Sequence, residues 1–223
     1  MSSSSPTSDP VTPERNNSTI LTMASTVSYV KLQYFNGDLY EGYWLNPQGC
    51  PHGYGTYTWQ DGLKYEGSWR KGLKHGYGSQ TYPSGDKYEG GWKDGQWHGY
   101  GELTQTSMGR TYFGGFASGL EHGYAQIRRG GADNRFYDGG VRQGQRHGYG
   151  NLTTPLGTME GGYKYNKQDG WQEVKAPMRH DYSGTYRDGK MWGVGRMVEY
   201  ASGKTFDGVW ENNDYKGPLT YKK

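Results

Sequence analysis

The chain has 223 residues, a formal net charge of +3, 39 glycines and 22 tyrosines. Hydrophobic residues make up only 31%, about half of them aromatic, so aliphatic side chains are too few for a thick globular core. The small net charge excludes the strong field of a nucleic-acid-binding protein. The single cysteine, Cys50, excludes an intramolecular disulfide framework and indicates a reducing compartment such as the cytoplasm.

The chain begins with a segment rich in Ser, Thr and Pro, residues 1–28, which predicts a disordered tail without the features of a signal peptide. Residues 29–223 are predicted to form one repeat domain. Its first part, residues 29–36, has strand character and matches the second half of the repeat described next. We therefore expect a half-repeat that caps the sheet, followed by eight repeats over residues 37–223.

A unit of 22 to 25 residues occurs eight times, and its first part has the spacing Y-x-G-x-W. The opening residues are Tyr40, Tyr65, Tyr88, Tyr112, Tyr137, Met159, Tyr182 and Phe206. A repeat of this length indicates an array in which each unit is one supersecondary element. Such a unit buries its apolar face only by stacking on its neighbours.

The second repeat shows the expected local structure. Alternation places Tyr65, Gly67 and Trp69 on one face of a strand. A turn around Gly72 leads to a second strand that opens with H-G-Y-G at residues 75–78. Each unit is therefore predicted to be a β-hairpin. The chain is predicted to be all-β, an elongated single-layer antiparallel β-meander of repeated hairpins with about sixteen strands.

Strand spacing decides which aromatic rings can touch. Strands lie about 4.8 Å apart, so the tryptophans of successive repeats are about 10 Å apart, too far for ring contact. We expect tyrosines of the intervening strands to fill these gaps, with the repeat glycine leaving room for a ring over the backbone. The fillers would be Tyr54, Tyr77, Tyr100, Tyr124 and Tyr149. The residues predicted to line a partner-binding groove are Trp44, Tyr54, Trp69, Tyr77, Trp92 and Tyr100.

Residues 65–78 (YEGSWRKGLKHGYG) and 88–101 (YEGGWKDGQWHGYG) resemble MORN repeats (membrane occupation and recognition nexus). The resemblance extends roughly from Gly37 to Tyr221 and is weakest in the sixth repeat, where Met159 replaces the tyrosine. It implies similarity to repeat-only MORN scaffolds of cytoskeletal, ciliary or junctional assemblies. MORN enzymes carry a methyltransferase or lipid kinase domain after the repeats. Since two residues follow the last repeat here, we expect no enzyme activity.

Histidines recur in phase with the repeat, and charged residues flank its aromatic positions. The ladder consists of His52, His75, His98, His122 and His147. Its rungs are about 10 Å apart, too far to share a metal, so we expect hydrogen bonds at the hairpin turns and neither metal nor other cofactor. The alternative is a metal site between two molecules, with His180 or Cys50 as a further ligand. The acids after the repeat tyrosine and the bases after the tryptophan are predicted to form a solvated face with cross-strand pairs.

Together these patterns favour a non-catalytic adaptor whose groove holds a helical or extended segment of another protein. We expect it in the cytoplasm, at a cytoskeletal, ciliary or membrane-associated assembly. One alternative is weak binding to anionic phospholipids, and another is self-association, for example as a homodimer. The basic residues considered for lipid contact are Arg70, Lys71, Lys74, Arg128, Arg129, Arg142 and Arg146.

Overall fold

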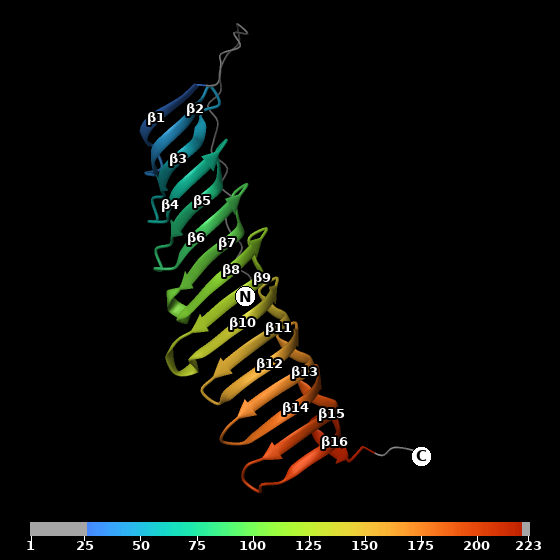
Figure 1. Cartoon of the computed structure of the whole chain (residues 1–223). Coiled ribbons are helices and arrows are strands. Elements are labelled where there is room, and N and C mark those ends of the chain that lie inside the picture. Colours follow the sequence, from blue (N-terminus) through green and yellow to red (C-terminus); the bar gives the residue numbers. More distant parts are fainter. Residues whose placement is uncertain (1–25, 220–223) are drawn as a thin grey trace.

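The computed structural model describes residues 26–219, which form one open sheet of seventeen strands. Each strand pairs antiparallel with the next in sequence, so chain order follows the long axis of the sheet (Figure 1). The predicted all-β meander of hairpins is thereby confirmed. The strands are β1 (Thr26–Gln33), β2 (Leu39–Asn46), β3 (Cys50–Thr58), β4 (Lys64–Arg70), β5 (Leu73–Thr81), β6 (Lys87–Lys93), β7 (Gln96–Gln105), β8 (Arg110–Ala117), β9 (Leu120–Arg129), β10 (Arg135–Arg142), β11 (Gln145–Thr154), β12 (Gly157–Lys164), β13 (Lys167–Ala176), β14 (His180–Arg187), β15 (Lys190–Glu199), β16 (Thr205–Glu211) and β17 (Asp214–Gly217).

The edge strand β1 occupies the place of the predicted half-repeat and pairs with β2 along its whole length. It begins at Thr26, so the last three residues of the predicted tail belong to the sheet. The remainder of that tail, residues 1–25, lies outside the described residues. Two short 3-10 helices, Thr106–Met108 and Gly131–Asp133, lie in the β7–β8 and β9–β10 connections.

Three residues, 47–49, close the β2–β3 hairpin, and two-residue turns close the other seven hairpins and tie each of them to the one before it. In the β4–β5 turn, Lys71 and Gly72 have φ values of 49° and 82°, as a type I′ turn requires. The amide of Gly72 donates to the carbonyl of Pro51 in the preceding hairpin at 2.8 Å. The corresponding bond is donated by Gly95, Gly119, Gly144, Asn166, Gly189 and Asn213.

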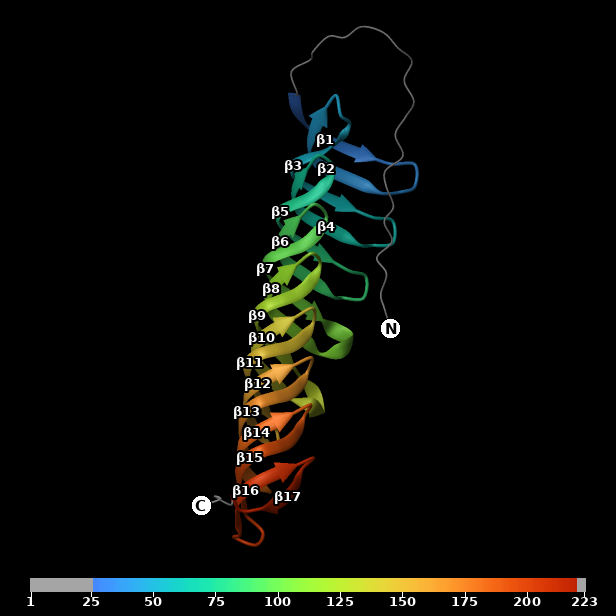
Figure 2. The same cartoon turned by 90° about the vertical axis from the view of Figure 1, so that its right-hand side faces the viewer.

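A β-bulge interrupts the hairpin in every repeat. In the second repeat, Gly67 pairs with Gly78 and Trp69 pairs with Lys74. Ser68 therefore faces three residues of β5, and the middle one, Gly76, has φ +77°. Equivalent shifts interrupt six other hairpins, and in the last hairpin the irregularity is a single extra residue, Lys216 on β17. Because a bulge bends its strand, a row of bulges in phase bends the whole sheet to one side (Figure 2).

The side chains on the side of the sheet that carries Tyr65 form the core, and we call this side the inner face. Tyr65 is fully buried and Trp69 is 7% exposed. The Tyr65 ring packs edge-to-face on Trp69 of its own repeat (4.9 Å between centroids) and on Trp92 of the next (5.2 Å). The repeat tyrosine therefore fills the gap between successive tryptophans.

The prediction that Tyr77 fills this gap is wrong. Gly78 pairs with Gly67 on the inner face, so the alternation of side chains points Tyr77 to the opposite side, which we call the outer face. Tyr77 is 62% exposed there. The same correction applies to Tyr54, Tyr100, Tyr124 and Tyr149.

The expected role of the glycines is confirmed. The Tyr65 ring lies over the backbone, and a Cβ added at Gly78 would lie 2.4 Å from its hydroxyl oxygen. That hydroxyl donates to the carbonyl of Ser68 at 2.9 Å, where the bulge interrupts the ladder. The Trp69 indole N–H donates to the carbonyl of Gly55 in the previous repeat at 3.1 Å.

The sixth repeat replaces this arrangement with another. Met159 stands where the tyrosine belongs, and Gln172 stands where the last glycine belongs. Gln172 is fully buried, and its amide donates to the carbonyl of Gly162, the equivalent of Ser68. A glutamine from the neighbouring strand thus supplies the donor that the missing tyrosine would have provided.

Polar side chains help to cover the inner face. The Lys74 ammonium lies 4.8 to 5.2 Å from the ring centroids of Trp59, Tyr65 and Trp92, and it donates to the side-chain oxygen of Gln80. Cation–π contact favours the charged amine. Burial disfavours it and lowers the pKa of Lys74 to about 8.

Replacing Gly78 with Ala tests the contact between glycine and ring. We expect the free energy of unfolding to fall by about 1–3 kcal/mol, because the new methyl group overlaps the buried Tyr65 side chain. Gly130→Ala is the matched control, since its Cβ would meet no atom closer than 3.7 Å. Urea unfolding followed by tryptophan fluorescence gives both values. Equal unfolding of the two variants would contradict the packing described here.

Replacing Lys74 with Met tests its burial. With a folded-state pKa of about 8, below the unfolded value, the lysine lowers stability at pH 7, and this cost disappears as pH rises through 8 to about 10.5. We expect the melting temperature of Lys74→Met to exceed that of wild type at pH 7. This difference in melting temperature should be smaller at pH 10. Thermal melts at both pH values measure this. Tyrosine and cysteine titration is common to both proteins, so an unchanged difference would mean that Lys74 is not desolvated.

Candidate functional site

The outer face carries a row of exposed rings, one per hairpin. They occupy the third position of the H-G-x-G segment, and each is between 55% and 66% exposed. We call this row the outer ladder: Tyr54, Tyr77, Tyr100, Tyr124, Tyr149 and Trp171. Because one strand intervenes between successive members, equivalent atoms are about 10 Å apart.

Carboxylates on the intervening strands accept hydrogen bonds from four of the five ladder tyrosines, while Tyr100 has Phe113 beside it instead. Tyr54 donates to Glu66 at 3.0 Å and Tyr77 donates to Glu89 at 3.1 Å. Tyr124 donates to Asp138, and Tyr149 donates to Glu160 at 2.5 Å. The bond to Glu66 raises the pKa of Tyr54, and bonds from Lys64 and Tyr54 lower the pKa of Glu66. The phenol is therefore protonated and the carboxylate charged at neutral pH.

These carboxylates belong to a column that we call the acidic column: Glu41, Glu66, Glu89, Glu102, Asp138, Glu160, Glu173 and Asp207. Glu41 forms a cross-strand pair with Lys31 at 3.1 Å, but Lys31 is not one of the bases after the tryptophan, and Arg70, which is one, pairs with Asp94 at 3.1 Å. Lys64 instead pairs with Glu66 two residues away on the same strand, at 3.0 Å. Exposed pairs of this kind contribute little stability, so the carboxylates remain available to a stronger cationic partner.

Glycines line the outer face between four pairs of ladder rings. Gly91, Gly115, Gly140 and Gly162 pair directly with Tyr77, Tyr100, Tyr124 and Tyr149. A Cβ at Gly91 would lie 2.1 Å from the His98 carbonyl oxygen, so the bulge favours glycine there. The equivalent Ser68 in the second repeat shows that the fold also accepts a side chain. We call the spaces between successive ladder rings slots.

Two open hollows border the strands that carry the ladder. One, of about 490 Å³, is lined by Tyr29, Tyr43 and Tyr54 together with Lys31 and Glu41. Another, of about 450 Å³, borders Gly140 and is lined by His122, Val141, Arg142 and His147, without the ladder rings Tyr124 and Tyr149.

The six residues predicted to line one groove lie on two faces. Trp69 and Trp92 are core residues, 7% and 5% exposed, and Trp44 is half-buried against Tyr40 at 5.6 Å. Tyr54, Tyr77 and Tyr100 lie on the outer face. These six residues therefore do not form a single surface, and only the three tyrosines are open to a partner.

The structure also disperses the seven basic residues considered for lipid contact. Arg70, Lys71 and Arg142 lie at the two-residue turns, while Arg128 and Arg129 lie at the other end of the hairpins. Lys74 and Arg146 are on the inner face, where the Arg146 guanidinium lies 5.1 Å from the Tyr163 ring centroid. These seven residues therefore do not form one continuous basic patch.

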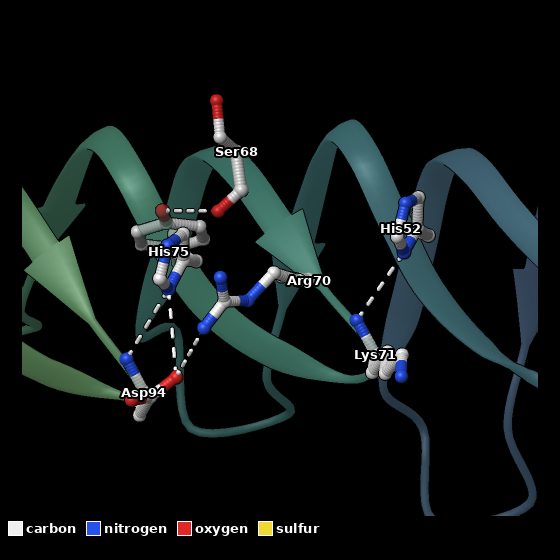
Figure 3. A network of polar contacts seen from close by, with 7 residues as sticks. His52, Ser68, Arg70, Lys71, His75 and Asp94 are labelled. Carbon is white, nitrogen blue, oxygen red and sulfur yellow. Dashed lines mark hydrogen bonds and ion pairs between the residues drawn. The ribbon is translucent and has the colours of Figure 1, made fainter.

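The histidine ladder joins successive hairpin turns (Figure 3). The Nδ1 atom of His52 accepts from the amide of Lys71 at 3.3 Å, and that of His75 accepts from Asp94 at 3.5 Å. Arg70 also donates to the Asp94 carboxylate at 3.1 Å. The structural role predicted for the histidines is thereby confirmed for these two. Within residues 26–219, no three His, Cys, Asp or Glu side chains are grouped as metal ligands.

Sequence reasoning missed the acidic column as a partner of the ladder, and it also missed the glycines between the rings. The signal was present, because a ring at the third H-G-x-G position recurs in phase with an acid after the repeat tyrosine. It identifies a surface only when the strand register is known. No helix in the described part of the chain combines the length and apolar character needed to cross a membrane.

Comparison with protein families finds the MORN repeat at residues 48–64, 65–87, 88–107, 137–159 and 182–198. Four of these segments begin at a repeat tyrosine, namely Tyr65, Tyr88, Tyr137 and Tyr182. The comparison with curated proteins gives no significant match. The family match, the hairpin register and the aromatic core agree, and the chain belongs to the MORN-repeat proteins.

Proposed function

We propose that this protein is a non-catalytic scaffold that binds a segment of another protein along the outer ladder. The observation that carries the proposal is the unbroken series of exposed rings from Tyr54 to Trp171. Large aromatic side chains that recur in an exposed row are typical of interaction surfaces. The buried rings of the inner face serve the fold and leave this role to the outer face.

The ladder is well suited to binding because four of its six rings are already held by hydrogen bonds. A tyrosine whose hydroxyl is bonded to a carboxylate, as Tyr77 is to Glu89, loses less side-chain freedom when a partner packs on it. Each slot repeats the same chemistry, so a long segment gains affinity from several weak contacts. No acid in the column differs from its copies as a catalytic acid would, which favours binding over catalysis.

The single cysteine fits a reducing compartment, so we propose a cytoplasmic scaffold within a cytoskeletal, ciliary or membrane-associated assembly. The lipid alternative gains no support from the placement of the basic residues. Self-association through the outer face remains the alternative that the next experiment separates.

Substituting Tyr77 and Tyr100 with Ser should abolish capture of a specific protein from a eukaryotic lysate, because two adjacent rings are lost. The matched control is Leu73→Ser with Leu120→Ser, which removes two apolar side chains of similar exposure at the hairpin turns. Quantitative mass spectrometry of both captures and of wild type gives the comparison. Light scattering of the purified proteins reports self-association.

Circular dichroism must first show that all three proteins retain the sheet. A protein recovered with wild type and the leucine variant, but lost with the tyrosine variant, is the expected result. Equal recovery with all three would refute binding by the ladder. A wild-type dimer that becomes monomeric in the tyrosine variant alone, without a lost protein, would mean that the ladder joins two copies of this chain.

A further inference from the structure

We infer that the occupant of the outer ladder is a basic, proline-rich segment in the polyproline II conformation. Its prolines would enter the slots, and its arginines or lysines would meet the acidic column. This inference rests on the proposed function, since it names the partner of the same surface. Three independent properties of the surface support it: spacing, backbone pairing and charge.

The spacing of the ladder is set by the backbone. Two strand separations of about 4.8 Å place successive slots about 9.6 Å apart. A polyproline II helix has three residues per turn and rises about 3.1 Å per residue, so every third residue returns to the same side after about 9.3 Å. Along the four glycine-lined slots, from Tyr77 to Trp171, the accumulated mismatch is only about 1 Å.

Other regular conformations match the slots less well. In an extended strand, three residues span about 10 Å, but successive third residues point to opposite faces. In an α-helix, two turns span about 10.8 Å, so the mismatch grows to roughly 4 Å over the same four slots. Polyproline II alone presents equivalent side chains at every slot.

The backbone beneath the ladder offers no free edge. The strands from β5 to β13 are paired on both sides, so an occupant cannot add itself to the sheet as a further strand. A polyproline II segment has no backbone hydrogen bonds to other strands and keeps its carbonyls solvated. It therefore loses no backbone hydrogen bonds when it binds to such a surface. Proline rings in aromatic-lined grooves are the usual contact of such segments.

The acidic column supplies the charge preference. Glu89 lies directly across from Glu102, and Glu160 lies across from Glu173. Like charges in direct cross-strand register destabilise a sheet. Lys87 and Lys175 pair with Glu89 and Glu173, at 2.6 Å and 3.1 Å.

Glu102 has no side-chain hydrogen bond or ion pair within residues 26–219. A cation from a partner would reduce the repulsion between Glu102 and Glu89 and would bond to the Glu102 carboxylate. Exposed tyrosine faces also attract cations. The two glutamate pairs are three hairpins apart, or about 29 Å, which equals about nine polyproline II residues. Basic residues spaced by multiples of three therefore reach both pairs.

The test uses the full chain and two labelled fifteen-residue peptides, measured by fluorescence anisotropy in 0.15 M salt. One peptide consists of five Pro-Arg-Ser triplets. The other has the same composition, with prolines separated alternately by two and four positions. We expect the triplet peptide to bind at least about tenfold more tightly, because only its prolines keep the slot spacing. Equal affinity for both peptides would overturn the inference.

Two variants locate the peptide. Tyr77→Ser with Tyr100→Ser should weaken the triplet peptide by about tenfold or more, and Leu73→Ser with Leu120→Ser should leave its affinity unchanged. Glu102→Gln should weaken binding and reduce its salt dependence, because one carboxylate contact is lost. Unchanged affinity in both the tyrosine and the Glu102 variants would place the peptide elsewhere and refute the inference.

The experiment also separates this inference from the proposed function. If the tyrosine variant loses a lysate protein but the triplet peptide shows no preference, the ladder is a docking surface for another class of segment. The chain itself contains Pro10, Pro13 and Arg15 with a three-residue proline spacing. If only a Pro10→Ala, Pro13→Ala variant binds the triplet peptide, the occupant is this chain's own segment, and an external partner is refuted.

Discussion

The structure depends on the contact between the repeat tyrosine and two facing glycines. A single-layer sheet has no second layer to cover its apolar side, so its rings must cover one another. Tyr65 achieves this by lying over Gly67 and Gly78, where its hydroxyl bonds to the carbonyl that the bulge leaves free. The bulge in turn bends the strand and brings the rings of neighbouring repeats together. The sixth repeat supports this account, because the loss of its tyrosine coincides with a buried Gln172 that bonds to the equivalent carbonyl.

In this arrangement the inner face supplies the core packing and the outer face remains exposed. The inner face contains nearly all the buried rings and even retains a lysine, Lys74, among three of them. The outer face has side chains that packing does not need, so its regularity is free to serve recognition. Exposed tyrosines recur on it at every hairpin from Tyr54 to Tyr149, and each has a carboxylate beside it except Tyr100. Phe113 occupies the position of the acid beside Tyr100. Each repeat thus contributes core residues to one face of the sheet and a periodic surface to the other.

The period of that surface is a backbone property, because strand separation varies little. Side-chain drift among the repeats changes the chemistry of single slots and leaves their spacing intact. Ser68 and Thr185 fill the positions that glycines occupy in the central repeats, and Val194 ends the series of rings. The central four slots are consequently the most uniform part of the molecule, and a periodic ligand gains most from them.

The sequence by itself determined the hairpins, their number and the meander, because alternation and turn chemistry act within a few residues of each other. It also placed Tyr65, Gly67 and Trp69 on one face and assigned the histidines to the turns. The side on which Tyr77 lies was decided only by the tertiary structure, through the pairing of Gly78 with Gly67. A bulge that sets three residues against one depends on contacts between strands, and alternation within one strand does not reveal it. For the same reason, only the packing of neighbouring bent hairpins shows that Trp69 and Lys74 are buried. Their burial is what leaves the outer face as the proposed binding surface.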